Sequence, residues 1–133
     1  MPLLDLVGSL VTIVAANGVG RIALPDGASA GRPSFALFEA PAAVVLHAAH
    51  RALQALVTPK DLEHQCCETS LAYANLIARG EWFGPARAEL DTAVLATEQR
   101  VTGTVRITLF KGTCRVETAT QGSHQKTLLV GKQ

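Results

Sequence analysis

The chain has 133 residues, a formal net charge of +1 and 48% hydrophobic residues. This length fits one domain with a single core, spanning 1–133, and excludes two full domains. The near-neutral charge offers no basic surface, so we expect no nucleic-acid partner. The longest apolar runs stop well short of the roughly 20 residues that a membrane-spanning helix needs, so we expect a soluble protein without membrane association.

The N-terminus and the cysteines indicate the cellular compartment in which the protein is expected. Asp5 stands where a secretory signal peptide would carry Lys or Arg, which predicts a cytoplasmic protein. Cys66, Cys67 and Cys114 cannot all pair with one another, as expected in a reducing compartment. None of them has a second Cys or His pair at zinc spacing, so we predict no metal site.

The first part of the chain predicts a helix followed by two strands. Apolar residues recur at helical spacing over 3–16, and Asn17-Gly18 provides a stop, although Val, Thr and Ile near the end also permit a strand. Short extended segments at 20–24 and 34–38, separated by a loop rich in Gly, Ser and Pro, indicate a hairpin.

Three helices are predicted in the middle of the chain. They begin at Pro41, at Lys60 or Asp61, and at Pro85. The first runs to Val57, the second to about Ala78 and the third to about Gln99. The leucines and other apolar residues expected to form their buried faces are Leu62, Leu71, Leu76 and Ile77 in the second helix, and Leu90, Val94 and Leu95 in the third.

The last part of the chain alternates apolar and polar residues, which is typical of strands with one solvated face. Alternation runs from Val101 to Leu109, Lys111-Gly112 forms a turn, a second strand covers 113–120, and a short third strand covers 127–130. Strands at both ends of a helical middle predict an α+β domain, with a mostly antiparallel sheet and helices on one side.

Several strings, in order, resemble the argininosuccinate synthase family. They are Gly18-Val19-Gly20-Arg21-Ile22, Glu39-Ala40-Pro41-Ala42, Ala49-His50-Arg51-Ala52-Leu53, Trp82-Phe83-Gly84-Pro85, and the stretch from Gln99 to Arg106 with Lys111-Gly112. The resemblance covers about residues 3–117 of the C-terminal, substrate-binding and multimerisation domain, and leaves 118–133 as a diverged tail. It implies that the ATP-binding domain of that family is lacking, because no phosphate-cradling loop is present. We therefore expect no cofactor and no synthase reaction by this chain alone.

The resemblance also implies that citrulline contacts are altered. The family carries a Glu and a Tyr that touch citrulline at the positions occupied here by Asp26 and Phe38. Phe38 has no hydroxyl, so a polar ligand group facing it would be left unpaired at a cost of about 1 to 3 kcal/mol. The family's tail that ties subunits together is also absent, which puts the usual tetramer in question.

The altered positions suggest a repurposed scaffold whose pocket accepts an apolar ligand. In a regular strand, Phe35 and Phe38 point to opposite faces, so at most one of them faces a site. As catalytic candidates we take Asp26 and His47, the latter because His suits proton transfer near neutral pH. The substrate-binding candidates are Phe35, Phe38, Glu39 and Arg51. Glu39 comes just before the helix that carries His47, and Arg51 lies one turn beyond His47, so the three can form a polar cluster along one edge.

Three functions remain open. The first is a small cofactor-free enzyme of the cyclase or isomerase type, acting on an apolar metabolite in bacterial specialised metabolism. The second is a non-catalytic subunit that pairs with a separate nucleotide-binding domain or a complete synthase, and the third is a binding or oligomerisation module. A closed pocket lined by Phe38 would favour the first, whereas a large exposed apolar patch would favour the others. In each case we expect self-association, because an uncovered interface is usually satisfied by a second copy.

Overall fold

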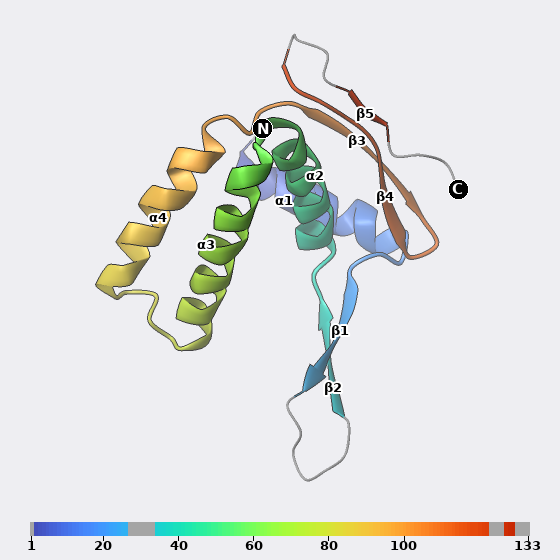
Figure 1. Cartoon of the computed structure of the whole chain (residues 1–133). Coiled ribbons are helices and arrows are strands. Elements are labelled where there is room, and N and C mark those ends of the chain that lie inside the picture. The colour runs from blue at the N-terminus through green and yellow to red at the C-terminus, as the bar shows by residue number, and fades with distance from the viewer. Residues whose placement is uncertain (1, 27–33, 123–126, 130–133) are drawn as a thin grey trace.

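The computed structural model describes residues 2–26, 34–122 and 127–129. Four helices and five strands follow one another along the chain (Figure 1). Their bounds are α1 Leu3–Ala16, β1 Arg21–Asp26, β2 Ser34–Glu39, α2 Pro41–Val57, α3 Lys60–Ala78, α4 Pro85–Glu98, β3 Thr104–Phe110, β4 Thr113–Thr120 and β5 Thr127–Leu129. The elements predicted from the sequence are therefore present, with β3 beginning at Thr104 and not at Val101.

The first segment is a helix and not a strand. Helix α1 begins after Pro2 and ends at Asn17-Gly18, where Gly18 adopts a φ of +71°, the left-handed conformation that commonly ends a helix. Val14 is fully buried, and the amide of Val19 donates to the carbonyl of Val14. The helical spacing of its apolar residues, which places Leu10 and Val14 on one face, outweighs the strand preference of the β-branched residues.

The core lies between two helices and one face of a three-stranded sheet. Strands β3, β4 and β5 pair antiparallel in that order, and α1 and α2 pack on one side of them (Figure 1). The central cluster consists of Val14, Val19 and Val45, against which Ile107 and Leu109 of β3 pack. This arrangement confirms the predicted α+β class. Strands β1 and β2 form a separate two-stranded sheet that extends away from this core.

The predicted buried faces of α3 and α4 are only partly right. Leu76 is 1% exposed, but Leu71 is 63% and Leu95 is 64% exposed, so the prediction was wrong for these two residues. The prediction was also wrong for Leu62 and Ile77, which are 40% and 54% exposed. The physical reason is that α3 and α4 pack mainly against each other (Figure 1). One stripe of each helix is covered, fully at Leu76 and only partly at Leu90 and Val94, while the opposite side faces solvent. Within the described ranges, none of the helices has the length and hydropathy required to cross a bilayer.

Candidate functional site

The most distinctive feature is the hairpin formed by β1 and β2, which we call the apolar hairpin. Its two strands pair without a break from Arg21 opposite Glu39 to Asp26 opposite Ser34. It leaves the body of the molecule and extends beyond the lower ends of the neighbouring helices in Figure 1. A two-stranded hairpin of this kind is marginally stable in water unless something packs on it.

The base of the apolar hairpin is held firmly. The amide of Ala40 donates to the carbonyl of Gly20 over 2.8 Å, and Arg21 Nε lies 3.0 Å from Glu39 Oε1. Gly20 has a φ of +115°, and a Cβ at that position would lie 2.4 Å from the Cα of Pro41. Only glycine satisfies both the backbone conformation and this close approach, which explains the Gly at that place in the Gly-Val-Gly string.

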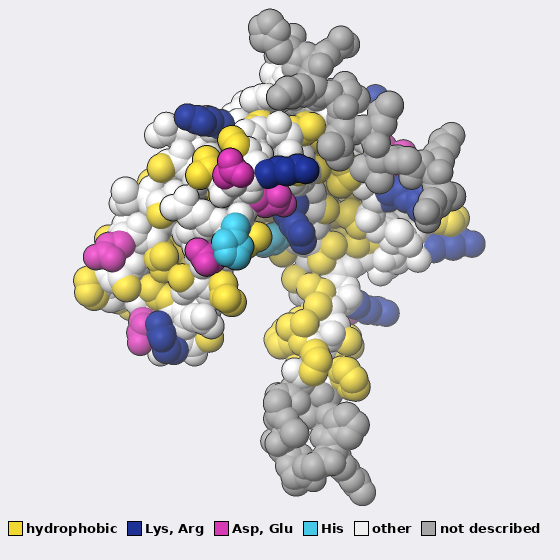
Figure 2. Space-filling view, in the orientation of Figure 1, with side chains coloured by type: hydrophobic (Ala, Val, Ile, Leu, Met, Phe, Trp, Pro, Cys, Tyr) yellow, Lys and Arg dark blue, Asp and Glu magenta, His cyan; other side chains and the backbone are white. Residues whose placement is uncertain are grey.

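The rest of the apolar hairpin is hydrophobic on both faces and exposed. Four large side chains contribute, with exposures of 50% for Leu24, 66% for Phe35, 67% for Leu37 and 50% for Phe38. Figure 2 shows hydrophobic side chains following one another along it. The unbroken register places Phe35 and Phe38 on opposite faces, as predicted. Both faces of the hairpin therefore present large apolar side chains to solvent.

The predicted catalytic and binding residues are spread over three elements, β1, β2 and α2. Asp26 ends β1 opposite Ser34, and its side chain lies outside the described part of the structure. His47 and Arg51 are exposed on α2. Glu39 forms its ion pair with Arg21, on the neighbouring strand.

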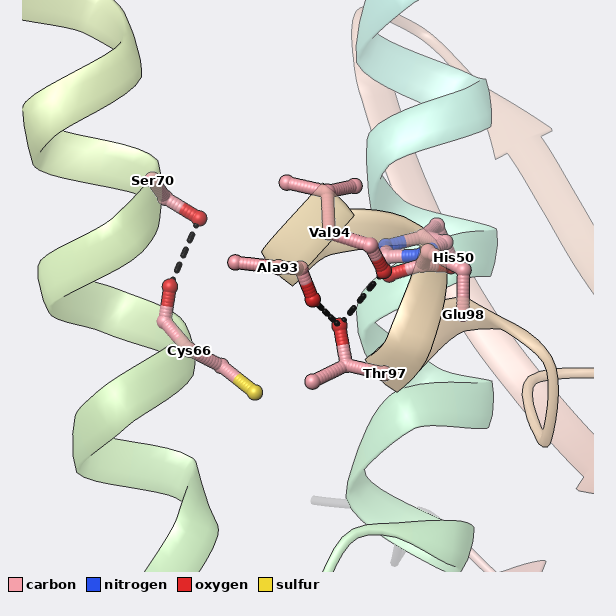
Figure 3. Close-up of polar contacts among 7 residues, drawn as sticks. All are labelled: His50, Cys66, Ser70, Ala93, Val94, Thr97 and Glu98. Atoms are coloured by element: carbon pink, nitrogen blue, oxygen red, sulfur yellow. Dashed lines mark hydrogen bonds and ion pairs between the residues drawn. The ribbon is translucent and has the colours of Figure 1, made fainter. Parts of the chain in front are cut away.

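His50, which belongs to one of the strings that carry the family resemblance, makes a contact that the sequence did not reveal. Its Nε2 lies 2.6 Å from Oε2 of Glu98, the last residue of α4 (Figure 3). Figure 3 also shows Thr97 bound to the carbonyl oxygens of Ala93 and Val94, one turn back in the same helix. The two residues of the inter-helix bond are 48 positions apart, so no local spacing could have indicated it.

A second polar cluster ties α3 to α4 and was also missed. The Tyr73 hydroxyl donates to Asp91 Oδ1 over 2.7 Å, and Arg87 lies 4.7 Å above the ring of Trp82 while its Nε contacts Asp91 at 3.3 Å. The hydrogen bond to the Asp91 carboxylate raises the pKa of Tyr73 above its ordinary value, because that bond requires the protonated phenol. The i, i+4 spacing of Arg87 and Asp91 was the one available sequence signal.

The grooves on the described surface include two shallow ones. The larger, of about 400 Å³, lies between the end of α2 and the start and end of the β3–β4 pair, and is lined by Leu56, Val57, Gln99, Arg100, Thr102, Gln121 and Gly122. The smaller, of about 210 Å³, is lined by Trp82, Phe83, Gly84, Arg87, Ala88 and Asp91. None of the predicted catalytic or substrate-binding residues lines either groove. Across the described residues, no group of three or more His, Cys, Asp or Glu side chains gathers as metal ligands would.

Helix α1 also exposes apolar side chains, since Leu3 is 71% and Leu4 is 84% exposed. The described part of the molecule therefore exposes large hydrophobic side chains on both the apolar hairpin and α1.

Comparisons with known proteins agree on one family. Residues 1–127 match the family model of the arginosuccinate synthase C-terminal domain. Among similar proteins, the argininosuccinate synthases of Chlorobium chlorochromatii, Chlorobium phaeobacteroides (strain BS1) and Chlorobaculum tepidum are 43%, 46% and 44% identical over 109 residues. Each alignment covers 82% of this chain and 27% of the relative. The chain therefore spans about a quarter of the length of the relatives it matches.

Proposed function

The chain belongs to the arginosuccinate synthase C-terminal domain family, and from that premise we propose that it acts as a non-catalytic association subunit. In this role it supplies an apolar surface to partner chains and carries out no chemistry of its own. The observation that supports this most directly is the apolar hairpin, whose two faces are both hydrophobic and both exposed. Surfaces of this kind on soluble chains mark sites of protein interaction.

The changes at the citrulline positions support the same proposal. By the family resemblance, residue 38 would present a hydroxyl to citrulline, and here it presents a phenyl ring that is 50% exposed. The neighbouring strand contributes Ile22 opposite Phe38 and Leu24 two residues further on. A polar substrate placed against these side chains would lose hydrogen bonds to water without replacement, whereas a protein surface would gain from covering them.

The cyclase or isomerase function remains a prediction. It would need a cavity in which Phe38 meets a polar group such as His47, and the two grooves described above are lined by other residues. Both aromatic side chains of the hairpin are instead open to solvent. A cytoplasmic location also remains a prediction.

Native mass spectrometry combined with light scattering tests the proposed function. The chain is measured alone over a range of micromolar concentrations, and again after mixing with a complete argininosuccinate synthase such as that of Chlorobium phaeobacteroides. We expect a stable homo-oligomer or a stoichiometric complex with the synthase. A chain that stays monomeric in both experiments and retains an apolar metabolite would overturn the proposal in favour of a pocket enzyme.

A further inference from the structure

The backbone of the apolar hairpin leaves one strand edge open. In an antiparallel pair, opposed residues alternate between those that exchange hydrogen bonds and those whose N–H and C=O groups point outward. The bond from the Ala40 amide to the Gly20 carbonyl fixes this alternation, because it makes that pair a hydrogen-bonded one. The outward-pointing backbone groups of β2 therefore belong to Phe35, Leu37 and Glu39.

The other edge of the hairpin is blocked. By the same alternation, the backbone groups of β1 that point outward belong to Arg21, Ala23 and Pro25. Pro25 has no N–H to donate, and a proline at such a position is a common way in which proteins protect a strand edge from further pairing. The hairpin therefore has one edge that can accept another strand, β2, and one edge that resists it.

We propose that β2 pairs edge to edge with β2 of a second copy of this chain, antiparallel across a two-fold axis. The result is a four-stranded sheet in the order β1, β2, partner β2, partner β1. This inference rests on the proposed association function and specifies its partner and its contact surface. The outward backbone groups of Phe35 and Leu37 supply the new hydrogen bonds.

The side chains select one register for this pairing. When the two-fold axis passes between Ala36 of the two copies, Phe35 lies opposite the partner's Leu37, and Leu37 lies opposite the partner's Phe35. Each of these cross-strand pairs joins an aromatic and an aliphatic side chain, which stabilises antiparallel sheets. With Leu37 on the axis instead, Phe35 would lie opposite the partner's Glu39, so that an aromatic ring would face a carboxylate. The first register is therefore the favoured one.

A second copy suits this edge for two further reasons. From Phe35 to Phe38 the strand carries no charge, so two copies meet without repulsion between like charges. The two exposed side chains of this face, Phe35 at 66% and Leu37 at 67%, are covered symmetrically by their counterparts.

Proline substitutions test the edge pairing with a matched control. Leu37→Pro removes an outward N–H from the open edge, while Ala23→Pro removes one from the blocked edge directly opposite in the register. Sedimentation and light scattering should show an oligomer for the wild type and for Ala23→Pro, and its loss for Leu37→Pro at the same concentration. Leu37→Lys, which keeps the N–H and places a charge at the edge, should also weaken the oligomer at least tenfold. Unchanged Trp82 fluorescence would show that the body remains folded.

A cysteine cross-link tests the register. With Ala36 on the axis, Ala36 and the partner's Ala36 form a non-hydrogen-bonded pair with Cα atoms about 4.5 Å apart, which is within reach of a disulfide. Ala36→Cys should give a covalent dimer on mild oxidation, in excess of any formed by the wild type, while Ala23→Cys should not. Oligomers that survive Leu37→Pro and are not cross-linked by Ala36→Cys would overturn the edge pairing and leave the association function standing. A wild-type chain that binds only a synthase would do the same.

Discussion

His50 Nε2 lies 2.6 Å from Glu98 Oε2, and this bond connects α2 with the end of α4. It matters because α3 and α4 pack mainly against each other, while α2 belongs to the core beneath the three-stranded sheet. The side chains of His50 and Glu98 are 42% and 30% exposed, so the bond is partly shielded from water. This bond connects the α3–α4 pair with the rest of the fold.

Removing this bond should lower stability by a measurable coupling energy. A double-mutant cycle of His50→Ala and Glu98→Ala is expected to give a coupling of about 0.5 to 1.5 kcal/mol in urea unfolding. The control is the pair His64 and Glu68, which is 3.3 Å apart and 83% and 68% exposed. Its coupling should stay below about 0.5 kcal/mol because solvent screens it. Equal coupling energies for the two pairs would show that the bond between His50 and Glu98 stabilises the fold no more than an exposed ion pair does.

Gly20 should be intolerant of any side chain. Gly20→Ala forces a Cβ to within 2.4 Å of the Pro41 Cα at a φ of +115°, so we expect a loss of about 3 kcal/mol or more in the free energy of unfolding. Gly80 also has a positive φ, of +73°, but an added Cβ would meet nothing within 4 Å. Gly80→Ala should therefore cost only about 1 to 2 kcal/mol. If both substitutions cost the same, the contact with Pro41 is not what constrains Gly20.

Two leucines of α3 should differ sharply in their contribution to stability. Leu76 is 1% exposed and Leu71 is 63% exposed. Leu76→Ala removes a fully buried side chain and should cost about 2 to 5 kcal/mol, while Leu71→Ala should change the free energy of unfolding by less than about 0.5 kcal/mol. Chemical denaturation followed by circular dichroism measures both. A large loss for Leu71→Ala would reveal that this face of α3 is covered in solution.

The phenol of Tyr73 should titrate at higher pH than a free tyrosine. The chain contains one tyrosine, so the absorbance of tyrosinate near 295 nm reports on this residue alone. Its pKa is raised because the hydroxyl donates to the Asp91 carboxylate. Since the folded state favours the protonated phenol, this stabilisation is fully present below the unfolded pKa of about 10 and is lost as pH rises through the folded value. Asp91→Asn should bring the titration back toward the ordinary value, and an unchanged titration would contradict the assigned cause.

The sequence predicted local structure well and contacts between distant segments poorly. Pro41 and Pro85 marked the starts of α2 and α4 because proline is suited to the first turn of a helix. Alternation predicted β3 because one face of that strand packs on the core. The outward position of Leu95 could not be predicted, because periodicity identifies an apolar stripe but not whether a neighbour covers it. The bond between His50 and Glu98 depends on how two helices meet, which no local pattern records.

The separation of the apolar hairpin from the core affects how this domain can evolve. The core of the body contains Val14, Val19 and Val45, whereas the apolar hairpin carries Phe35 and Leu37. Because Phe35 and Leu37 are 66% and 67% exposed, substitutions there should change the surface that the protein presents and alter its folding free energy little. Selection for binding and selection for foldability therefore act on different residues. The apolar hairpin can acquire new partners while the core of the body is retained.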